Sequence, residues 1–159
     1  MLRRKTLSIL VFSIVLAGIA WGYTQRSTAA GSMTAQDYID IQQLYARFYQ
    51  ALDSGDAETW ADTFTPDGIW NTTTKGHDAL VENNKRGGQN KPLRHSNSNL
   101  IITPTAEGAT GRLYVFQTNI TTKPPSVATY SRYDDTLVKT SQGWRFKTRQ
   151  RPADTTIGK

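Results

Sequence analysis

Two short stretches of this 159-residue sequence carry the side chains best suited to proton transfer. The first, YQALDSGDAETW, holds Asp53 and Asp56 on either side of Gly55. The second, LRHSNSNLII, holds His95 with Asn97 and Asn99 at alternate positions. Carboxylates and imidazoles are common general acids and bases, so these stretches are the first candidates for a reactive site.

Both stretches also have a purely structural interpretation. Asp53 can hydrogen-bond backbone amides in a turn, and its place at the negative end of a helix costs only about 0.3–1 kcal/mol. His95, Asn97 and Asn99 share one strand face by alternation, and each needs a hydrogen-bond partner if it is buried. Spacing alone favours a turn role for Asp53 and a solvated strand end for His95.

A long helix must position Asp53. Residues 33–53 are predicted to be helical, with Thr34 or Ser32 as the N-cap, because apolar side chains recur with helical spacing. They are Ile41, Leu44, Tyr45, Phe48, Tyr49 and Leu52. Asp53 lies about 40° beyond Tyr49, just outside the apolar stripe. Gly55 is predicted to end the helix, and Asp56 to cap a second, shorter one.

The remaining pattern is a short third helix followed by antiparallel strands. TPDG at 65–68 predicts a turn, IWNTT a short strand, and KGHDALVENNKR a helix after Gly76. The strands are expected at 93–103, 110–120, 126–140 and 143–151. Helices first and antiparallel strands afterwards predict an α+β domain, with the helices packed against one face of a curved sheet.

The last expected strand alternates between apolar and basic side chains. Trp144, Phe146 and Thr148 should lie on one face, and the other should hold Arg145, Lys147, Arg149 and Arg151. No aromatic residue interleaves with the arginines, so a solvated outer face is favoured over a nucleic-acid site. No nucleic-acid partner is therefore expected.

The N-terminus has the pattern of a secretory signal peptide. A basic start, MLRRK, precedes the apolar run 7–23 and the small residues STAAGS. Residues 1–30 are therefore expected to be a cleaved signal peptide, with an uncleaved membrane anchor as the alternative. Either way the domain should be exported, as a periplasmic or secreted protein or outside the cytoplasm on an anchor. Only this segment would contact a membrane.

Charge and composition limit the chemistry of the folded part. Four of the 19 basic residues and none of the 13 acidic ones lie in residues 1–30, which leaves a net charge of +2 elsewhere. The absence of cysteine excludes disulfides and thiolate chemistry. His77 and His95 lack the spacing of a metal site, and no phosphate-binding glycine motif occurs. We therefore expect neither a metal nor a cofactor.

The order of several motifs resembles a known family. LYARFYQALDSGDAETWADTFTPDGIW, KGHDAL, RHSNSN and YDDTLVKTSQGWRF together resemble a SnoaL-like domain of the nuclear transport factor 2-like superfamily. The resemblance covers about residues 34–151, nearly all of the chain after the signal segment. It implies a cone-shaped α+β barrel over residues 31–151 with a deep pocket and frequent dimerisation through the sheet. Residues 152–159 are expected to be a flexible tail because the ends of domains are often poorly ordered.

Within that superfamily the sequence is similar to the scytalone dehydratase and polyketide cyclase branch. The resemblance implies that Asp53 orients His95, and that His95 acts as the general acid and base. The branch's tyrosine before the aspartate is replaced by Leu52, and another tyrosine is replaced near Asn71. Tyr45, Tyr49 and Tyr130 are the alternatives for polarising a substrate carbonyl.

The expected function is that of an exported lyase or isomerase without a cofactor, acting on a small hydrophobic carbonyl compound. His95 and Asp53 are the candidate catalytic residues. The candidate residues lining an apolar pocket are Tyr49, Trp70, Asn99 and Phe116. The alternative is a non-catalytic binding module for an apolar ligand. A homodimer is expected from the resemblance alone.

Overall fold

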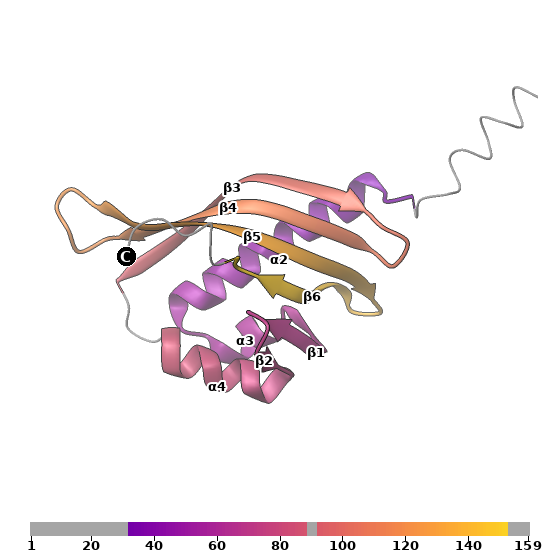
Figure 1. Ribbon diagram of the computed structural model, residues 1–159, viewed down its shortest axis with the longest axis horizontal. Coiled ribbons are helices and arrows are strands. Elements are labelled where there is room, and N and C mark those ends of the chain that lie inside the picture. Colours follow the sequence, from indigo (N-terminus) through magenta and orange to yellow (C-terminus); the bar gives the residue numbers. More distant parts are fainter. Residues whose placement is uncertain (1–31, 89–91, 153–159) are drawn as a thin grey trace, which may run out of the picture. The chain divides into compact units, whose positions relative to one another are not determined.

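The structure is a computed structural model that describes residues 32–88 and 92–152 (Figure 1). The predicted signal peptide or anchor at 1–30 and nearly all of the predicted tail lie outside the described residues. The folded unit begins at Met33. No helix within the described ranges is long and apolar enough to cross a membrane.

Helix α2 (Ala35–Ser54) is the predicted long helix, and both of its ends form as expected. The Thr34 side chain accepts the backbone N–H of Asp37, and the Asp37 carboxylate accepts the backbone N–H of Thr34. Gly55 ends the helix with φ 75°, a left-handed conformation that glycine adopts without strain. Five of the six predicted apolar side chains are buried, and Leu52 is partly buried.

The short elements follow the expected order with two corrections, the first being that the predicted strand IWNTT ends at Trp70 and residues 71–73 form a turn. Helix α3 (Ala57–Ala61) is capped by Asp56, and helix α4 (His77–Gly88) follows Gly76. The TPDG segment is not a turn between elements, because it lies inside strand β1 (Phe64–Trp70). Its extra residues bulge out of the pairing with β6 between Phe64 and Ile69. Strand β2 (Thr74–Lys75) pairs with the end of β1.

The four long strands confirm the predicted run of antiparallel strands. They are β3 (Leu93–Pro104), β4 (Ala109–Asn119), β5 (Ser126–Thr140) and β6 (Gly143–Gln150). The sheet order is β2-β1-β6-β5-β4-β3, and every pair is antiparallel except β1 with β6. The predicted α+β class, with helices packed in a curved, mostly antiparallel sheet, is confirmed.

Helix α2 runs along the sheet, and α3 and α4 lie beside the short strands β1 and β2 (Figure 1). The core lies between α2 and the sheet, where the Phe48 ring contacts the rings of Phe64 and Phe146 with centroids 6.0 and 5.5 Å apart. This packing places the C-terminal turn of α2 opposite the beginning of β3. The two stretches that sequence analysis singled out therefore lie side by side.

A bulge in β3 overturns the prediction that Asn99 lies on the same face as His95. Ser98 pairs with Tyr114, but Ile101 pairs with Arg112, so β3 has one extra residue between these pairs. Asn99 adopts φ 53° there and is exposed. An extra residue reverses which face the following side chains occupy. Ile101 is accordingly 62% exposed.

A second bulge overturns the prediction that Arg149 lies on a solvated outer face. Thr136 pairs with Thr148, whereas Leu137 pairs with Phe146, which leaves Lys147 as an extra residue in β6. The alternation holds for Trp144 and Phe146, which are buried, and then shifts by one position. Arg149 consequently points into the core and is fully buried.

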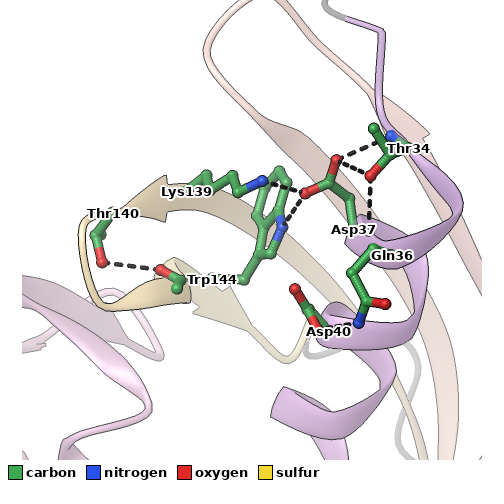
Figure 2. A network of polar contacts seen from close by, with 8 residues as sticks. Thr34, Gln36, Asp37, Asp40, Lys139, Thr140 and Trp144 are labelled. Atoms are coloured by element: carbon green, nitrogen blue, oxygen red, sulfur yellow. Dashed lines mark hydrogen bonds and ion pairs between the residues drawn. The ribbon is translucent and has the colours of Figure 1, made fainter.

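A polar network ties the start of α2 to the β5–β6 hairpin (Figure 2). The Asp37 carboxylate accepts the Lys139 ammonium at 2.7 Å and the Trp144 indole N–H at 2.9 Å. These bonds hold the pKa of Asp37 well below its ordinary value, chiefly through Lys139. The network fixes the N-terminal end of α2 against the sheet, at the end of the helix opposite Asp53.

Candidate functional site

A cavity of about 330 Å³ lies beside the C-terminal half of α2 and is lined by the predicted residues Asp53 and His95. We call it the His95 cavity. Its aromatic walls are formed by Phe48, Tyr49, Trp60, Trp70 and Tyr133. Its polar lining includes four side-chain amides and one arginine: Asn71, Asn83, Asn84, Gln117 and Arg151. The volume falls at the lower end of the range of about 300–1,000 Å³ that is usual for small-molecule pockets.

Asp53 and His95 are in direct contact. The His95 Nδ1 lies 2.5 Å from Asp53 Oδ1, and the His95 backbone N–H donates to Asp53 Oδ2 at 3.0 Å. The His95 side chain is 12% exposed and the Asp53 side chain is 14% exposed. Asp53 therefore holds both the ring and the backbone of His95. These two hydrogen bonds join the last turn of α2 to the start of β3.

This contact determines which nitrogen of His95 can react. A carboxylate at Nδ1 favours the tautomer that carries its proton there, which leaves Nε2 as a hydrogen-bond acceptor. Within the described part of the chain, Nε2 makes no hydrogen bond. Nε2 is thus the atom of His95 that can take a proton from a molecule in the cavity, while the carboxylate stabilises the resulting imidazolium.

The Tyr49 ring stacks on the ring of His95. The two rings are stacked with centroids 5.8 Å apart and an interplanar angle of 19°. The Tyr49 hydroxyl accepts a hydrogen bond from the Arg149 Nη2. Burial raises the pKa of Tyr49 above its ordinary value even though Arg149 opposes the effect. Tyr49 is therefore a neutral phenol at the cavity wall.

A buried charge pair, which the sequence pattern does not indicate, lies behind Tyr49. The Arg149 Nη1 donates to Asp135 Oδ2 at 2.7 Å, and the Tyr45 hydroxyl donates to the same oxygen at 2.7 Å. Burial raises the pKa of Asp135 to about 6, so at neutral pH it is ionised and pairs with Arg149. Five aromatic rings surround the guanidinium, with centroids 4.4–5.2 Å from its carbon: Tyr45, Phe48, Tyr49, Tyr133 and Phe146.

Two of the four predicted binding residues line the cavity and two do not. Tyr49 and Trp70 are lining residues. Asn99 does not line the cavity as predicted, because the β3 bulge leaves it exposed. Phe116 was also wrongly placed, since it lies on the opposite face from its neighbours Val115 and Gln117 and packs against Tyr130 with ring centroids 5.0 Å apart.

Leu52 and Asn71 occupy the cavity wall at the positions where the resemblance implies tyrosines. Of the three tyrosines considered as substitutes, only Tyr49 is a lining residue of the cavity. Tyr45 is buried behind it, and Tyr130 contacts Tyr114 and Phe116.

Other lining residues were missed because nothing in their local pattern marks them. Trp60 lies in the short helix α3, where its sequence pattern suggests only an apolar helix face, and Asn84 lies in a polar run of α4. Both are more than nine-tenths buried at the cavity. Within the described ranges, no cluster of three or more histidine, cysteine, aspartate or glutamate side chains could hold a metal ion.

Comparisons with known proteins agree with this fold. Residues 33–150 match the model of the SnoaL-like domain family. A search of curated proteins gave no match.

Three solved structures illustrate the similarity. A protein of unknown function from Mycobacterium tuberculosis is 27% identical and has a TM-score of 0.68, with 75% of this chain and 77% of that chain covered. A protein from Catenulispora acidiphila in complex with S-DNPA is 28% identical, with a TM-score of 0.66 and coverage of 74% and 93%. A scytalone dehydratase-like protein from Novosphingobium aromaticivorans, 24% identical, shares the fold with a TM-score of 0.62 and coverage of 77% and 87%.

Proposed function

Because the chain belongs to the SnoaL-like domain family, we propose that it is a small-molecule lyase or isomerase that uses His95 and Asp53 as a general acid–base pair. The observation that carries this proposal is the double contact of Asp53 with the ring and the backbone of His95 at the wall of the cavity. The substrate would be a hydrophobic carbonyl compound that fits between the aromatic walls.

The proposed reaction starts with removal of a proton from the carbon next to the carbonyl. The lone pair of His95 Nε2 takes the proton, and the electrons of the broken C–H bond move to the carbonyl oxygen to form an enolate. Asp53 stabilises the imidazolium through Nδ1. In a lyase reaction the proton then passes to a β-hydroxyl group, which leaves as water while the enolate electrons form the new double bond.

An isomerase would use the same first step and a different second one. The imidazolium would return the proton to another carbon of the conjugated enolate, so that the double bond moves and no group leaves. The neutral phenol of Tyr49 lies against His95 and would donate a hydrogen bond to the developing oxyanion. Both outcomes need only the side chains of this cavity.

A second candidate function is a binding module without catalysis. Leu52 and Asn71 stand at the cavity wall where the resemblance implies tyrosines. A solved relative in complex with S-DNPA supports binding of a small molecule in this family. A carrier or sensor would bind apolar compounds saturably and release them unchanged.

The test separates these functions by their products. A library of hydrophobic carbonyl compounds is screened for ligands that raise the melting temperature, because ligands that bind the folded state stabilise it. Stabilising compounds are then incubated with the protein and analysed by chromatography with mass spectrometry, which separates an isomer from a substrate of the same mass. Loss of one water or a rearranged isomer supports the enzyme, provided that His95→Ala abolishes the product. Saturable binding with no product from any stabilising compound supports the binding module.

We also propose that the domain acts outside the cytoplasm, since the first 30 residues have the pattern of a signal peptide or anchor. Expression of the full chain followed by cell fractionation tests this. The mass of the recovered protein shows whether the segment has been removed. Retention of the full-length chain in the cytoplasm would contradict export.

A further inference from the structure

Two buried side chains at the His95 cavity have polar atoms without hydrogen-bond partners. Trp60 is 1% exposed and Asn84 is 2% exposed, and both line the cavity. Within the described residues, the Trp60 Nε1 and both amide atoms of Asn84, Nδ2 and Oδ1, have no partner. Buried polar atoms in proteins are nearly always paired, so each exception calls for an explanation.

Stability does not explain these two residues. An unpaired buried amide lowers the free energy of unfolding, and an apolar side chain of similar shape in its place would be neutral or stabilising. The Trp60 ring packs against the rings of Phe48, Phe64 and Trp70, with centroids 5.3–5.7 Å away, so those neighbours offer no acceptor for the indole N–H. Both residues line the cavity, so a molecule bound there is the partner that we consider.

We infer that Trp60 and Asn84 form the polar recognition site of the His95 cavity, which binds a neutral ligand group carrying an acceptor oxygen beside a hydrogen-bond donor. The inference rests on the proposed function insofar as it assigns this group to the substrate. The two residues come from helices α3 and α4, which pack against each other. Hydroxy ketones, enolised diketones and primary carboxamides carry such a group.

The hydrogen-bonding capacity of the two side chains selects this class. An indole N–H only donates, whereas an amide both donates and accepts. A ligand oxygen can accept from Trp60 Nε1 and Asn84 Nδ2, and a neighbouring O–H or N–H can donate to Asn84 Oδ1. A plain ketone leaves Oδ1 unpaired, and a carboxylate places negative charge against it. A hydrocarbon leaves all three atoms unpaired.

The shielded amide atoms can reach a ligand with little rearrangement. The χ2 torsion of asparagine is broad and soft, so the amide plane can rotate toward a bound group. The cavity walls favour a flat body for the rest of the ligand, because the Trp70 and Tyr133 rings are stacked with centroids 5.7 Å apart at an angle of 24°. A ring system lying against this aromatic wall would carry the polar group at one end.

The test uses three probes of similar size with different polar groups. They are 2-naphthamide, which accepts and donates, 2-acetonaphthone, which only accepts, and 2-isopropylnaphthalene, which does neither. Dissociation constants are measured by calorimetry for the full chain as expressed and for Asn84→Leu. The measured quantity is the ratio of affinities between the amide and the hydrocarbon, compared between the two proteins, so that probe hydrophobicity cancels.

We expect Asn84→Leu to lower this ratio about tenfold or more, since it removes two hydrogen bonds to the amide, and to leave the melting temperature equal or higher. Trp60→Phe keeps an aromatic ring and removes the donor together with part of the indole. Because both probes meet the same smaller ring, it should lower the preference for the ketone over the hydrocarbon about three- to tenfold. The control Asn97→Leu, at an exposed position of β3, should leave the ratio unchanged.

An unchanged ratio in Asn84→Leu would overturn the inference, whatever the melting temperature. If that variant does not fold, an unchanged ketone preference in Trp60→Phe would overturn it instead. Binding alone is measured, and the series can be repeated in His95→Ala. Failure of the proposed catalysis is therefore distinguishable from failure of this recognition site.

Discussion

At the scale of single residues, the carboxylate of Asp53 does two things for His95. It fixes the backbone position through Oδ2 and the ring tautomer through Oδ1. A turn residue would satisfy nearby amides of its own loop, whereas Asp53 reaches a residue 42 positions away. The long-range contact distinguishes the two interpretations that spacing alone left open.

The first prediction concerns this carboxylate. Asp53→Asn keeps the size of the side chain but can present its amide N–H₂ to His95 Nδ1, which favours the tautomer with the proton on Nε2. We expect proton abstraction to slow by up to about 10⁴-fold, the effect seen when the same replacement puts a catalytic histidine in the wrong tautomer. Turnover of a substrate identified in the carbonyl library provides the measurement, and unchanged turnover would remove Asp53 from the mechanism.

The contact between Asp53 and His95 was predictable only through the family resemblance. Helical spacing placed Asp53 at the edge of the apolar stripe, but nothing in either stretch indicated that α2 ends opposite the start of β3. Arg149 was not predictable in this way. Its position in the core depends on one extra residue in β6. A strand with regular alternation would instead place its side chain on the outer face of the sheet.

At the scale of elements, the boundaries of the long helix and of the four long strands followed from local sequence, whereas those of β1 and the shifts within strands did not. The caps at Thr34, Gly55 and Asp56 and the four long strands were all predictable from residue types. The bulges at Asn99 and Lys147 depend on how neighbouring strands pair, which is a long-range property. These shifts account for the wrong placements of Asn99 and Arg149.

A second prediction tests the close approach of α2 to β4. A Cβ atom at Gly111 would lie 2.1 Å from the Tyr45 hydroxyl oxygen, which bonds to Asp135. Gly111→Ala should therefore displace Tyr45 and reduce the free energy of unfolding by about 1–3 kcal/mol. Urea unfolding gives this value.

Gly87→Ala is the matched control, because a Cβ there meets nothing within 4 Å. In the helical conformation of α4 it should stabilise the protein by about 0.5–1 kcal/mol. Equal effects of the two substitutions would contradict the close contact between Tyr45 and β4.

A third prediction concerns acid stability. The Lys139 ammonium and the other donors around Asp37 hold its pKa below the value in the unfolded chain, about 4. Because the folded state releases this proton more readily, the contribution is fully present above about pH 4 and is lost as the pH falls further.

Asp37→Asn should remove this component. The free energy of unfolding of the variant, measured by urea denaturation from pH 6 to pH 3, should fall less steeply than that of the wild type below about pH 4. If the free energies of unfolding of the two proteins fell in parallel with pH, the network in Figure 2 would make no contribution to the loss of stability in acid.

At the scale of the whole molecule, the two faces of the sheet have different surroundings. One face packs on α2 and holds the cavity, and the other carries the ring cluster of Tyr114, Phe116 and Tyr130, with centroids 5.0–5.3 Å apart. Tyr114 is 36% exposed. We propose that a homodimer forms through this outer face, as the family resemblance implies.

The fourth prediction follows from that proposal. Tyr114→Glu introduces a charge on the outer face and should convert the dimer to a monomer in light scattering. The cavity lies on the other face, so ligand binding per chain should persist. A wild-type protein that is monomeric at all accessible concentrations would contradict the dimer.

The central claim is that His95 takes a proton from carbon, and deuterium exchange tests it most directly. The ketone 2-tetralone, which has activated hydrogens next to its carbonyl, is incubated with the protein in deuterium oxide, and exchange is followed by proton NMR. We expect the wild type to accelerate exchange over buffer and His95→Ala to lose about 10²–10⁴-fold of that acceleration. Saturable binding of the ketone with equal exchange rates in the wild type and His95→Ala would contradict the account.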